Sequence, residues 1–135
     1  AYLDREAAFD AAAVGEASFE ETAEAWAAAD IATLRGLLDH RTDRPVTFGW
    51  GPRFLHSTGQ YHKGGPQNGV FLQITGAVTD DIEVPGKPYT LGRLQLAQAL
   101  GDLRALTSRG RPAVRLHLTD RVAGVRHVLS AAKEL

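Results

Sequence analysis

Apolar residues recur at helical spacing through the first forty positions, a region rich in alanine, which favours helix. Residues 18–21, Ser-Phe-Glu-Glu, have the form of a capping box and predict a helix that extends through Trp26. An apolar stripe follows at residues 31–38. Asp30 either caps a third helix at the start of this stripe or lies inside one long helix over residues 19–40, and the pattern is compatible with both.

The pattern changes after residue 44. Three short runs are predicted to be strands, and the first of them is β-branched and bounded by proline and glycine, which is typical of strands. They predict strands at residues 45–49, 70–75 and 113–118. The spacing between them leaves room for helices, so the chain reads as alternating strands and helices.

Two helices are predicted in this second part. Thr90 is expected to cap a long helix that stops before Gly110, and Asp120 a final helix over residues 122–133. Strands that alternate with helices are typical of βαβ units, in which a parallel sheet is covered on both faces. We therefore expect an α/β fold. The predicted inward positions are Leu91, Leu94, Ala97, Leu100, Leu103 and Leu106 in the long helix, and Val125, Val128 and Leu129 in the final one.

The change of pattern divides the chain into a helical N-terminal segment, residues 1–44, and a C-terminal α/β domain, residues 45–135. Three strands are fewer than the roughly four to six of a usual sheet. The chain also begins at Ala1 without methionine. We therefore expect a fragment of a longer protein, whose remaining sequence supplies further strands.

Composition excludes several classes of function. The 135 residues carry a formal net charge of −1, so no basic field attracts nucleic acid, and we expect no nucleic-acid partner. Cysteine is absent, which removes disulfides, thiolate zinc sites and cysteine nucleophiles and is compatible with a cytoplasmic protein. No run approaches the roughly 18 apolar residues of a membrane span, and no signal peptide is visible.

Hydrogen-bonding residues are concentrated at residues 56–66, His-Ser-Thr-Gly-Gln-Tyr-His-Lys-Gly-Gly-Pro. The stretch follows the predicted strand at 45–49, and ligands of open α/β sheets bind beyond the carboxyl ends of strands. A helix over 54–63 would end at the two glycines, which also let backbone approach a ligand closely. It would place His56, Gln60 and Lys63 on one face and Leu55, Thr58 and His62 on the next. A solvated helix face followed by a plain turn also accounts for these residues.

Other chemistries fit the stretch poorly. His56 and His62 are six residues apart rather than the four that place two zinc ligands on one helix face, so we expect no metal site. Ser57 lacks the flanking glycines of a nucleophile elbow. Lys63 precedes the glycines, whereas the lysine of a phosphate-binding Walker A loop follows them. His117 alternates within an apolar strand and is predicted to be a packed core histidine.

Longer stretches of the chain resemble a known family. Residues 51–66 and 70–75, with 81–90 (Asp-Ile-Glu-Val-Pro-Gly-Lys-Pro-Tyr-Thr), 96–106 and 110–118, are similar to the C-terminal part of bacterial glucose-6-phosphate isomerases, especially the form fused to transaldolase. The resemblance spans roughly residues 45–120. It implies a sugar-isomerase (SIS) domain with three α/β/α layers, of which the family has two, and this chain would be most of the second.

The resemblance also implies a reaction and roles for residues. The family interconverts glucose 6-phosphate and fructose 6-phosphate without a cofactor, in a step of glycolysis and gluconeogenesis. A histidine assists ring opening, and a glutamate then moves a proton between C2 and C1 through a cis-enediol. The catalytic histidine corresponds to His62, with His56 as a second candidate. The implied sugar or phosphate contacts are Arg53, Ser57, Thr58, Gln60 and Lys63, with His56 among them when it is not the catalytic group.

The chain departs from the family in ways that set its expected partners. No residue corresponds to the catalytic glutamate, and the lysine that follows a Gly-Val pair in the family's last helix is replaced by Arg126. The chain is therefore expected to be inactive alone and to need the missing N-terminal SIS domain, in a full-length homodimer that binds a sugar phosphate. A non-catalytic sugar-phosphate-binding module and a purely structural piece are the alternative functions.

Overall fold

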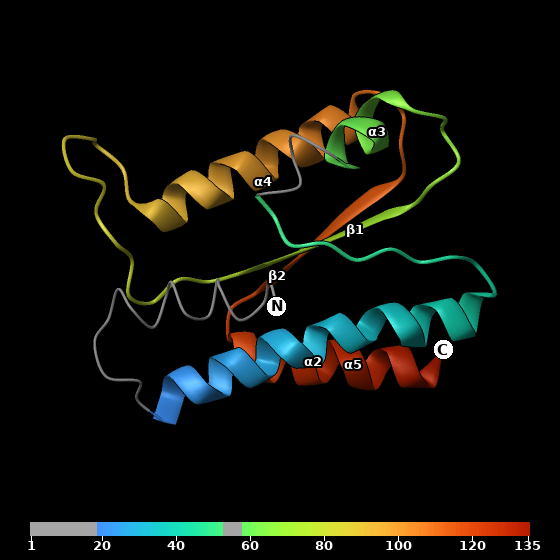
Figure 1. The fold of residues 1–135 in the computed structure, drawn as a ribbon, viewed down its shortest axis with the longest axis horizontal. Coiled ribbons are helices and arrows are strands. Elements are labelled where there is room, and N and C mark those ends of the chain that lie inside the picture. Colours follow the sequence, from blue (N-terminus) through green and yellow to red (C-terminus); the bar gives the residue numbers. More distant parts are fainter. Residues whose placement is uncertain (1–18, 53–57) are drawn as a thin grey trace. The chain divides into compact units, whose positions relative to one another are not determined.

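The structure, a computed structural model, describes residues 19–52 and 58–135, and of residues 19–29 and Thr58 it describes the backbone only. Helices and strands alternate in the second half of the chain (Figure 1). In chain order the elements are α2 (Phe19–Thr42), α3 (Thr58–Gly64), β1 (Phe71–Gly76), α4 (Leu91–Thr107), β2 (Ala113–Leu118) and α5 (Arg121–Glu134). None of these described helices combines the length and the apolar character needed to cross a membrane.

The described chain forms two compact units. One comprises residues 19–48 together with 120–135, and so contains α2 and α5. The other, Gly49–Thr119, contains α3, β1, α4 and β2. The expected boundary between residues 44 and 45 stays a prediction.

In the first unit, α2 packs against α5. Ile31, Leu34, Val125 and Ala132 are each about 5% exposed or less and form the core of the helix pair. Asp30 lies inside the single helix α2, so the long-helix alternative is confirmed and the separate cap at Asp30 is wrong. The Asp30 side chain is exposed, so a polar residue is tolerated inside the helix at this position. The proposed capping box at Ser18 lies outside the described residues.

The second unit is built on a β1–α4–β2 segment. β1 pairs in parallel with β2, from Phe71 opposite Ala113 to Gly76 opposite Leu118. The helix between them begins at its predicted cap, where the Thr90 side chain accepts a hydrogen bond from the Arg93 amide. Mixed α/β structure with a parallel strand pair is thus confirmed.

The strand predicted at residues 45–49 is wrong, because residues 45–50 are irregular and pair with no described strand. The sheet of the described residues therefore has two strands. Val46 instead donates its amide to the Asp39 carboxylate, which ties this segment to α2. A β-branched run predicts a strand only where a partner strand supplies the other half of its hydrogen bonds.

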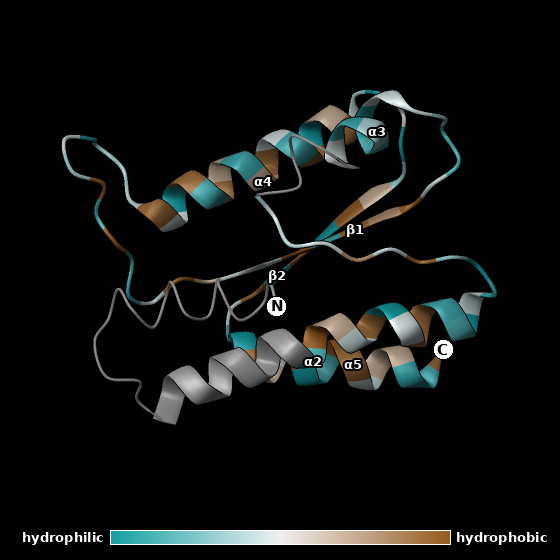
Figure 2. Cartoon of the chain, in the orientation of Figure 1, coloured by the Kyte–Doolittle hydropathy of each residue, from teal (hydrophilic) through white to brown (hydrophobic). Residues whose placement is uncertain are grey.

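The two faces of the sheet differ in polarity. Alternate residues of a strand point to opposite faces. Gln73 donates its side-chain amide to the Ala99 carbonyl of α4 at 2.9 Å, so α4 covers the face that carries Gln73. The opposite face carries Leu72, Val114 and Leu116, which are 44, 57 and 36% exposed. Figure 2 shows brown hydrophobic segments along both strands and, mixed with teal ones, along α4.

Candidate functional site

The predicted site residues fall on α3 and on the segment before it. The structure describes the side chains of Gln60, His62 and Lys63, and the backbone of Thr58. Arg53, His56 and Ser57 lie outside the described residues, so their roles stay predictions. Helix α3 ends at Gly64, as the glycine pair predicted.

His62 is half-buried and packs against the first residue of β1. Its ring centroid lies 5.4 Å from that of Phe71, with the planes inclined at 55°, a tilted stacking geometry. Because Phe71 begins the strand, His62 lies at the amino end of β1. The expected position beyond the carboxyl end of a strand at 45–49 is wrong, because that strand does not form. The imidazole is held in place yet remains reachable from solvent.

Lys63 connects α3 to α4 through an ion pair. Its Nζ lies 2.8 Å from Oδ1 of Asp102, and the two side chains are 17 and 12% exposed. Water screens such a shielded pair little, so the loss of Lys63 would leave the Asp102 carboxylate without this neutralising charge. The ion pair fixes Lys63 to α4, and the sugar contact expected of Lys63 stays a prediction.

The turn after α3 needs one of its two glycines. Gly65 donates its amide to the Tyr61 carbonyl at 2.7 Å, and a Cβ on Gly65 would meet that same oxygen at 2.7 Å. A Cβ on Gly64 would meet nothing within 4 Å. The close backbone approach expected of the glycine pair is therefore made by Gly65, and its partner is the chain's own helix.

A buried guanidinium holds the turn from the other side. Arg111, just before β2, is 5% exposed and donates to the Pro66 carbonyl at 2.9 Å and to the Gly65 carbonyl at 2.5 Å. The Gln67 side chain donates to the Arg109 carbonyl at 2.5 Å, and the Phe71 amide donates to the Pro112 carbonyl at 2.9 Å. The segments that enter β1 and β2 are thus bound together, and sequence reasoning missed Arg111 because nothing local marks an arginine as buried.

The carboxyl end of the sheet has its own polar group. Thr75 Oγ1 accepts a hydrogen bond from Arg115 Nη1 at 3.1 Å, donates to the Leu116 carbonyl at 3.3 Å and lies 3.0 Å from His117 Nδ1. The hydroxyl carries one proton, so the direction of the hydrogen bond between Thr75 and His117 follows the tautomer of His117. The expectation of a packed core histidine is wrong: His117 is exposed near the carboxyl end of β2.

Asp81 occupies the N-terminus of α4. Its carboxylate accepts hydrogen bonds from Thr90 Oγ1 at 2.5 Å, the Gly92 amide at 2.7 Å and the Ile82 amide at 2.9 Å. The Thr90 hydroxyl and then the Gly92 amide lower the pKa of Asp81 below its usual 3.8, against a smaller opposing effect of desolvation. A Cβ on Gly92 would meet Oδ2 of Asp81 at 2.7 Å. This helix end is therefore filled by the chain's own carboxylate rather than open to an anion.

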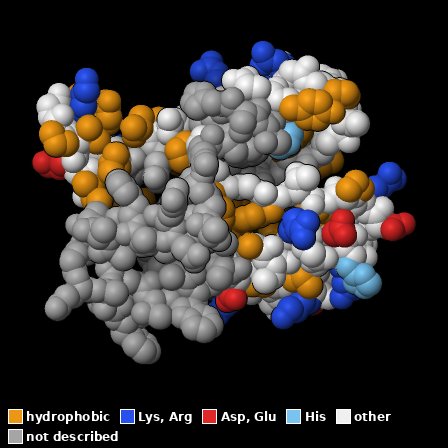
Figure 3. All heavy atoms as spheres, viewed as in Figure 1, with side chains coloured by type: hydrophobic (Ala, Val, Ile, Leu, Met, Phe, Trp, Pro, Cys, Tyr) orange, Lys and Arg blue, Asp and Glu red, His pale blue; other side chains and the backbone are white. Residues whose placement is uncertain are grey.

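The chain also has a pocket away from these residues. It measures about 350 Å³ and lies between α2 and α5, and none of the predicted site residues lines it. Within residues 19–52 and 58–135 no group of three or more histidine, aspartate or glutamate side chains is placed to hold a metal ion. Figure 3 shows acidic and basic side chains interspersed on one face, without a large region of one sign.

The described site thus consists of His62 on a short helix, Lys63 paired with Asp102, and a turn locked by Gly65 and Arg111. It fixes one half-exposed imidazole in space, which is what proton transfer to a bound molecule needs. Comparison with protein-family models, with curated proteins and with solved structures gave no match to this chain.

Proposed function

We propose that this chain is the C-terminal SIS domain of a glucose-6-phosphate isomerase, with the form fused to transaldolase as one candidate, and that it contributes the ring-opening histidine. In this proposal His62 acts on glucose 6-phosphate or fructose 6-phosphate in the cytoplasm, and the rest of the three-layer fold and of the site comes from outside the chain. The observation that carries the proposal is the setting of His62: a half-buried imidazole, fixed against Phe71 and still accessible.

Ring opening suits such an imidazole. Opening a pyranose or furanose ring requires a proton to reach the ring oxygen while the anomeric hydroxyl loses one. A neutral imidazole has one ring nitrogen that donates a proton and one that accepts a proton, so the His62 side chain has the groups needed to give and recover a proton. Stacking on Phe71 limits the rotamers of His62 and so lowers the entropy lost when substrate binds.

The residues around His62 then act by position. The Lys63–Asp102 ion pair joins α3 to α4, and Arg111 with Gly65 fixes the turn that leads into β1. Gln60 is exposed one turn before Lys63 and is available to orient a sugar hydroxyl. The predicted contacts from Arg53, His56, Ser57 and Thr58 complete the proposed sugar half-site.

The second half of the reaction, proton transfer between C2 and C1, needs a base. In the family this base is a glutamate, and no residue of this chain corresponds to it. The proposal assigns it to the missing N-terminal SIS domain, in a homodimer of the full-length protein. The chain alone is therefore expected to bind sugar phosphate weakly and to show no turnover above background. No cofactor takes part in the proposed chemistry.

Complementation tests the proposal. The 135-residue chain is mixed with the N-terminal SIS domain of a bacterial glucose-6-phosphate isomerase, and formation of glucose 6-phosphate from fructose 6-phosphate is followed. We expect turnover from the mixture and none from either part. His62→Gln should lower this turnover by about a hundredfold or more, whereas His127→Gln, a matched change on α5, should leave it unchanged.

Two results would contradict the proposal. Turnover by the chain alone would show that it holds its own base. Sugar-phosphate binding that is tight in the chain alone, with no turnover in any mixture, would instead identify a non-catalytic sugar-phosphate-binding module.

A further inference from the structure

The pocket between α2 and α5 is formed by one face of each helix. Arg126, Leu129, Ser130 and Lys133 lie at i, i+3, i+4 and i+7 of α5, and Asp30, Thr33 and Leu37 at i, i+3 and i+7 of α2. Leu37 and Leu129 are half-buried and form its apolar wall, above the buried core of the helix pair. The polar members are exposed at the opening.

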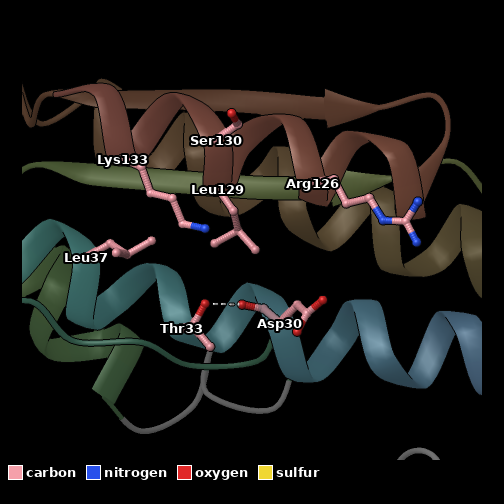
Figure 4. A pocket seen from close by; sticks show the side chains of 7 residues that line it. All are labelled: Asp30, Thr33, Leu37, Arg126, Leu129, Ser130 and Lys133. Atoms are coloured by element: carbon pink, nitrogen blue, oxygen red, sulfur yellow. Dashed lines mark hydrogen bonds between the residues drawn. The ribbon is translucent and has the colours of Figure 1, made fainter.

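Charge is distributed unevenly along the pocket. Figure 4 shows Asp30 facing the end that carries Arg126, and Lys133 pointing into the space between the helices at the other end, near Leu37. Seven residues of helix separate the Cα atoms of Arg126 and Lys133 by about 10 Å. One end therefore carries a carboxylate on α2 and a guanidinium on α5, and the other presents an ammonium group beside aliphatic side chains.

A third cation strengthens the Lys133 end. The Arg41 guanidinium donates a hydrogen bond to the Lys133 carbonyl, so it is held at the last turn of α5. It satisfies one of the carbonyl groups that a helix C-terminus leaves without partners and adds positive charge within a Debye length of the Lys133 ammonium. The two cations outweigh the partial negative charge of the helix C-terminus, so an anionic group is favoured at this end over the Asp30 end.

The middle and the Asp30 end suit hydroxyl groups. A carboxylate accepts hydrogen bonds from hydroxyls, a guanidinium donates to their oxygens, and the Ser130 hydroxyl does both. The Thr33 hydroxyl donates to the Asp30 carbonyl at 2.7 Å, which leaves its lone pairs as acceptors toward the pocket. A volume of about 350 Å³ lies at the lower end of the range for ligand pockets, roughly 300–1,000 Å³.

We infer that this pocket binds a small phosphate monoester with free hydroxyl groups, with the phosphate at Lys133 and the hydroxyls at Asp30, Arg126 and Ser130. The site is separate from the proposed His62 site and uses none of its residues. The inference does not depend on the isomerase proposal, because it follows from the charge and shape of the α2–α5 pair alone.

Two probes test the two ends of the pocket separately. Glycerol 3-phosphate carries a phosphate and hydroxyls, and inorganic phosphate carries only the charge. Each is titrated into the ¹⁵N-labelled 135-residue chain, and the amide signals of α2 and α5 are followed by NMR. We expect both probes to shift signals around residue 133, and glycerol 3-phosphate alone to shift signals around residue 30 and to bind more tightly.

Variants then distinguish the proposed polarity from general attraction to a basic surface. Lys133→Gln should lower the affinity for both probes by about tenfold. Lys87→Gln, the same change in an exposed loop, should leave both affinities unchanged. Asp30→Asn should lower the affinity for glycerol 3-phosphate, because it removes a carboxylate that accepts hydrogen bonds from hydroxyls. The same change should raise the affinity for inorganic phosphate, because it removes a repelling charge. Asp43→Asn makes the same charge change outside the pocket and serves as its control.

Several outcomes would overturn the inference. The pocket is not a phosphate site if neither probe shifts α2 or α5 signals at millimolar concentration. Equal affinity for the two probes, or parallel effects of Asp30→Asn on both, would show only charge attraction without recognition of hydroxyls. Retained α2 and α5 backbone signals in each variant establish that any loss of binding is not a loss of folding.

Discussion

The two ends of the β1–β2 sheet hold their neighbouring loops by different means. At the amino end, the charges are shielded: Arg111 is 5% exposed, and the Lys63 and Asp102 side chains are 17 and 12% exposed. At the carboxyl end, the Asp81 side chain is exposed and accepts three hydrogen bonds. Both ends hold a turn through side-chain hydrogen bonds or ion pairs. At the amino end the charged groups that do so are largely shielded from water, whereas at the carboxyl end the charged group is exposed.

The difference matters for function as well as for stability. A shielded charge that loses its partner is costly, so the amino end is the more rigid of the two and the better place to hold a catalytic imidazole. The solvated carboxyl end tolerates change because water replaces lost contacts. The proposed site at His62 is thus placed at the end where the side chains are most firmly held.

Removal of Arg111 should have the largest effect. Arg111→Met deletes two charged hydrogen bonds to the Gly65 and Pro66 carbonyls and leaves these acceptors without their partner. We expect the free energy of unfolding to fall by about 3–5 kcal/mol, measured by urea denaturation. Arg109→Met, at an exposed arginine two residues earlier, should cost less than about 1 kcal/mol. Equal losses in the two variants would show that the guanidinium does not hold the turn.

The ion pair at α3 should show the next largest effect. Lys63→Met leaves a shielded carboxylate unpaired and should lower the free energy of unfolding by about 3 kcal/mol. Adding Asp102→Leu should recover at least about 1 kcal/mol of this loss, because the double variant has no unpaired charge. Additive losses in the double-mutant cycle would exclude a direct coupling between the two side chains.

The two glycines after α3 provide a smaller, matched comparison. Gly65→Ala places a methyl group 2.7 Å from the Tyr61 carbonyl and should cost about 2 kcal/mol through displacement of the turn. Gly64→Ala meets open space and should leave stability within about 1 kcal/mol of the parent, with either sign. Thermal unfolding of the two variants measures the difference. Similar melting temperatures would mean that the turn shifts freely.

The carboxyl end should show the smallest effect, and it depends on pH. The pKa of Asp81 is lowered in the folded chain, so its contribution is present above the usual carboxyl pKa and is lost as the pH falls through the lowered value. As the pH falls below about 4, the free energy of unfolding should therefore decrease less in Asp81→Asn than in the parent. Asp80→Asn should keep the parent's acid sensitivity. Identical acid profiles for Asp81→Asn and the parent would contradict the cap.

Local pattern predicted much of this structure. The spacing of apolar residues and the caps Thr90 and Asp120 located α4 and α5, and the short runs at residues 70–75 and 113–118 located β1 and β2. These signals lie within a few residues of the elements they specify. The strand predicted at residues 45–49 does not form, because a strand also needs a partner strand, and the presence of a partner is not a local property of the sequence.

The site was less predictable for the same reason. The sequence drew attention to residues 56–66, but the contacts that position the described part of this stretch come from Asp102 and Arg111, about 40 residues later. The exposure of His117 likewise depends on which elements cover its face of the sheet rather than on its own neighbours in the chain. Predicted inward residues of α4 such as Leu94 and Leu100 are 37 and 43% exposed, because a single strand pair covers only part of the helix.

The histidine ring signals give the most direct test of the central claim, that sugar phosphate meets the chain at the amino end of the sheet. The chain is titrated with fructose 6-phosphate and its ring signals are followed by ¹H–¹³C NMR, with assignments from single His→Gln variants. Shifts of His127 report on α5 and bear only on the separate pocket. The account predicts that the His62 signals shift and saturate while those of His117 do not. Two results would contradict the account. In one, the His62 signals stay unchanged while those of His117 shift; in the other, no histidine signal of the unit Gly49–Thr119 shifts.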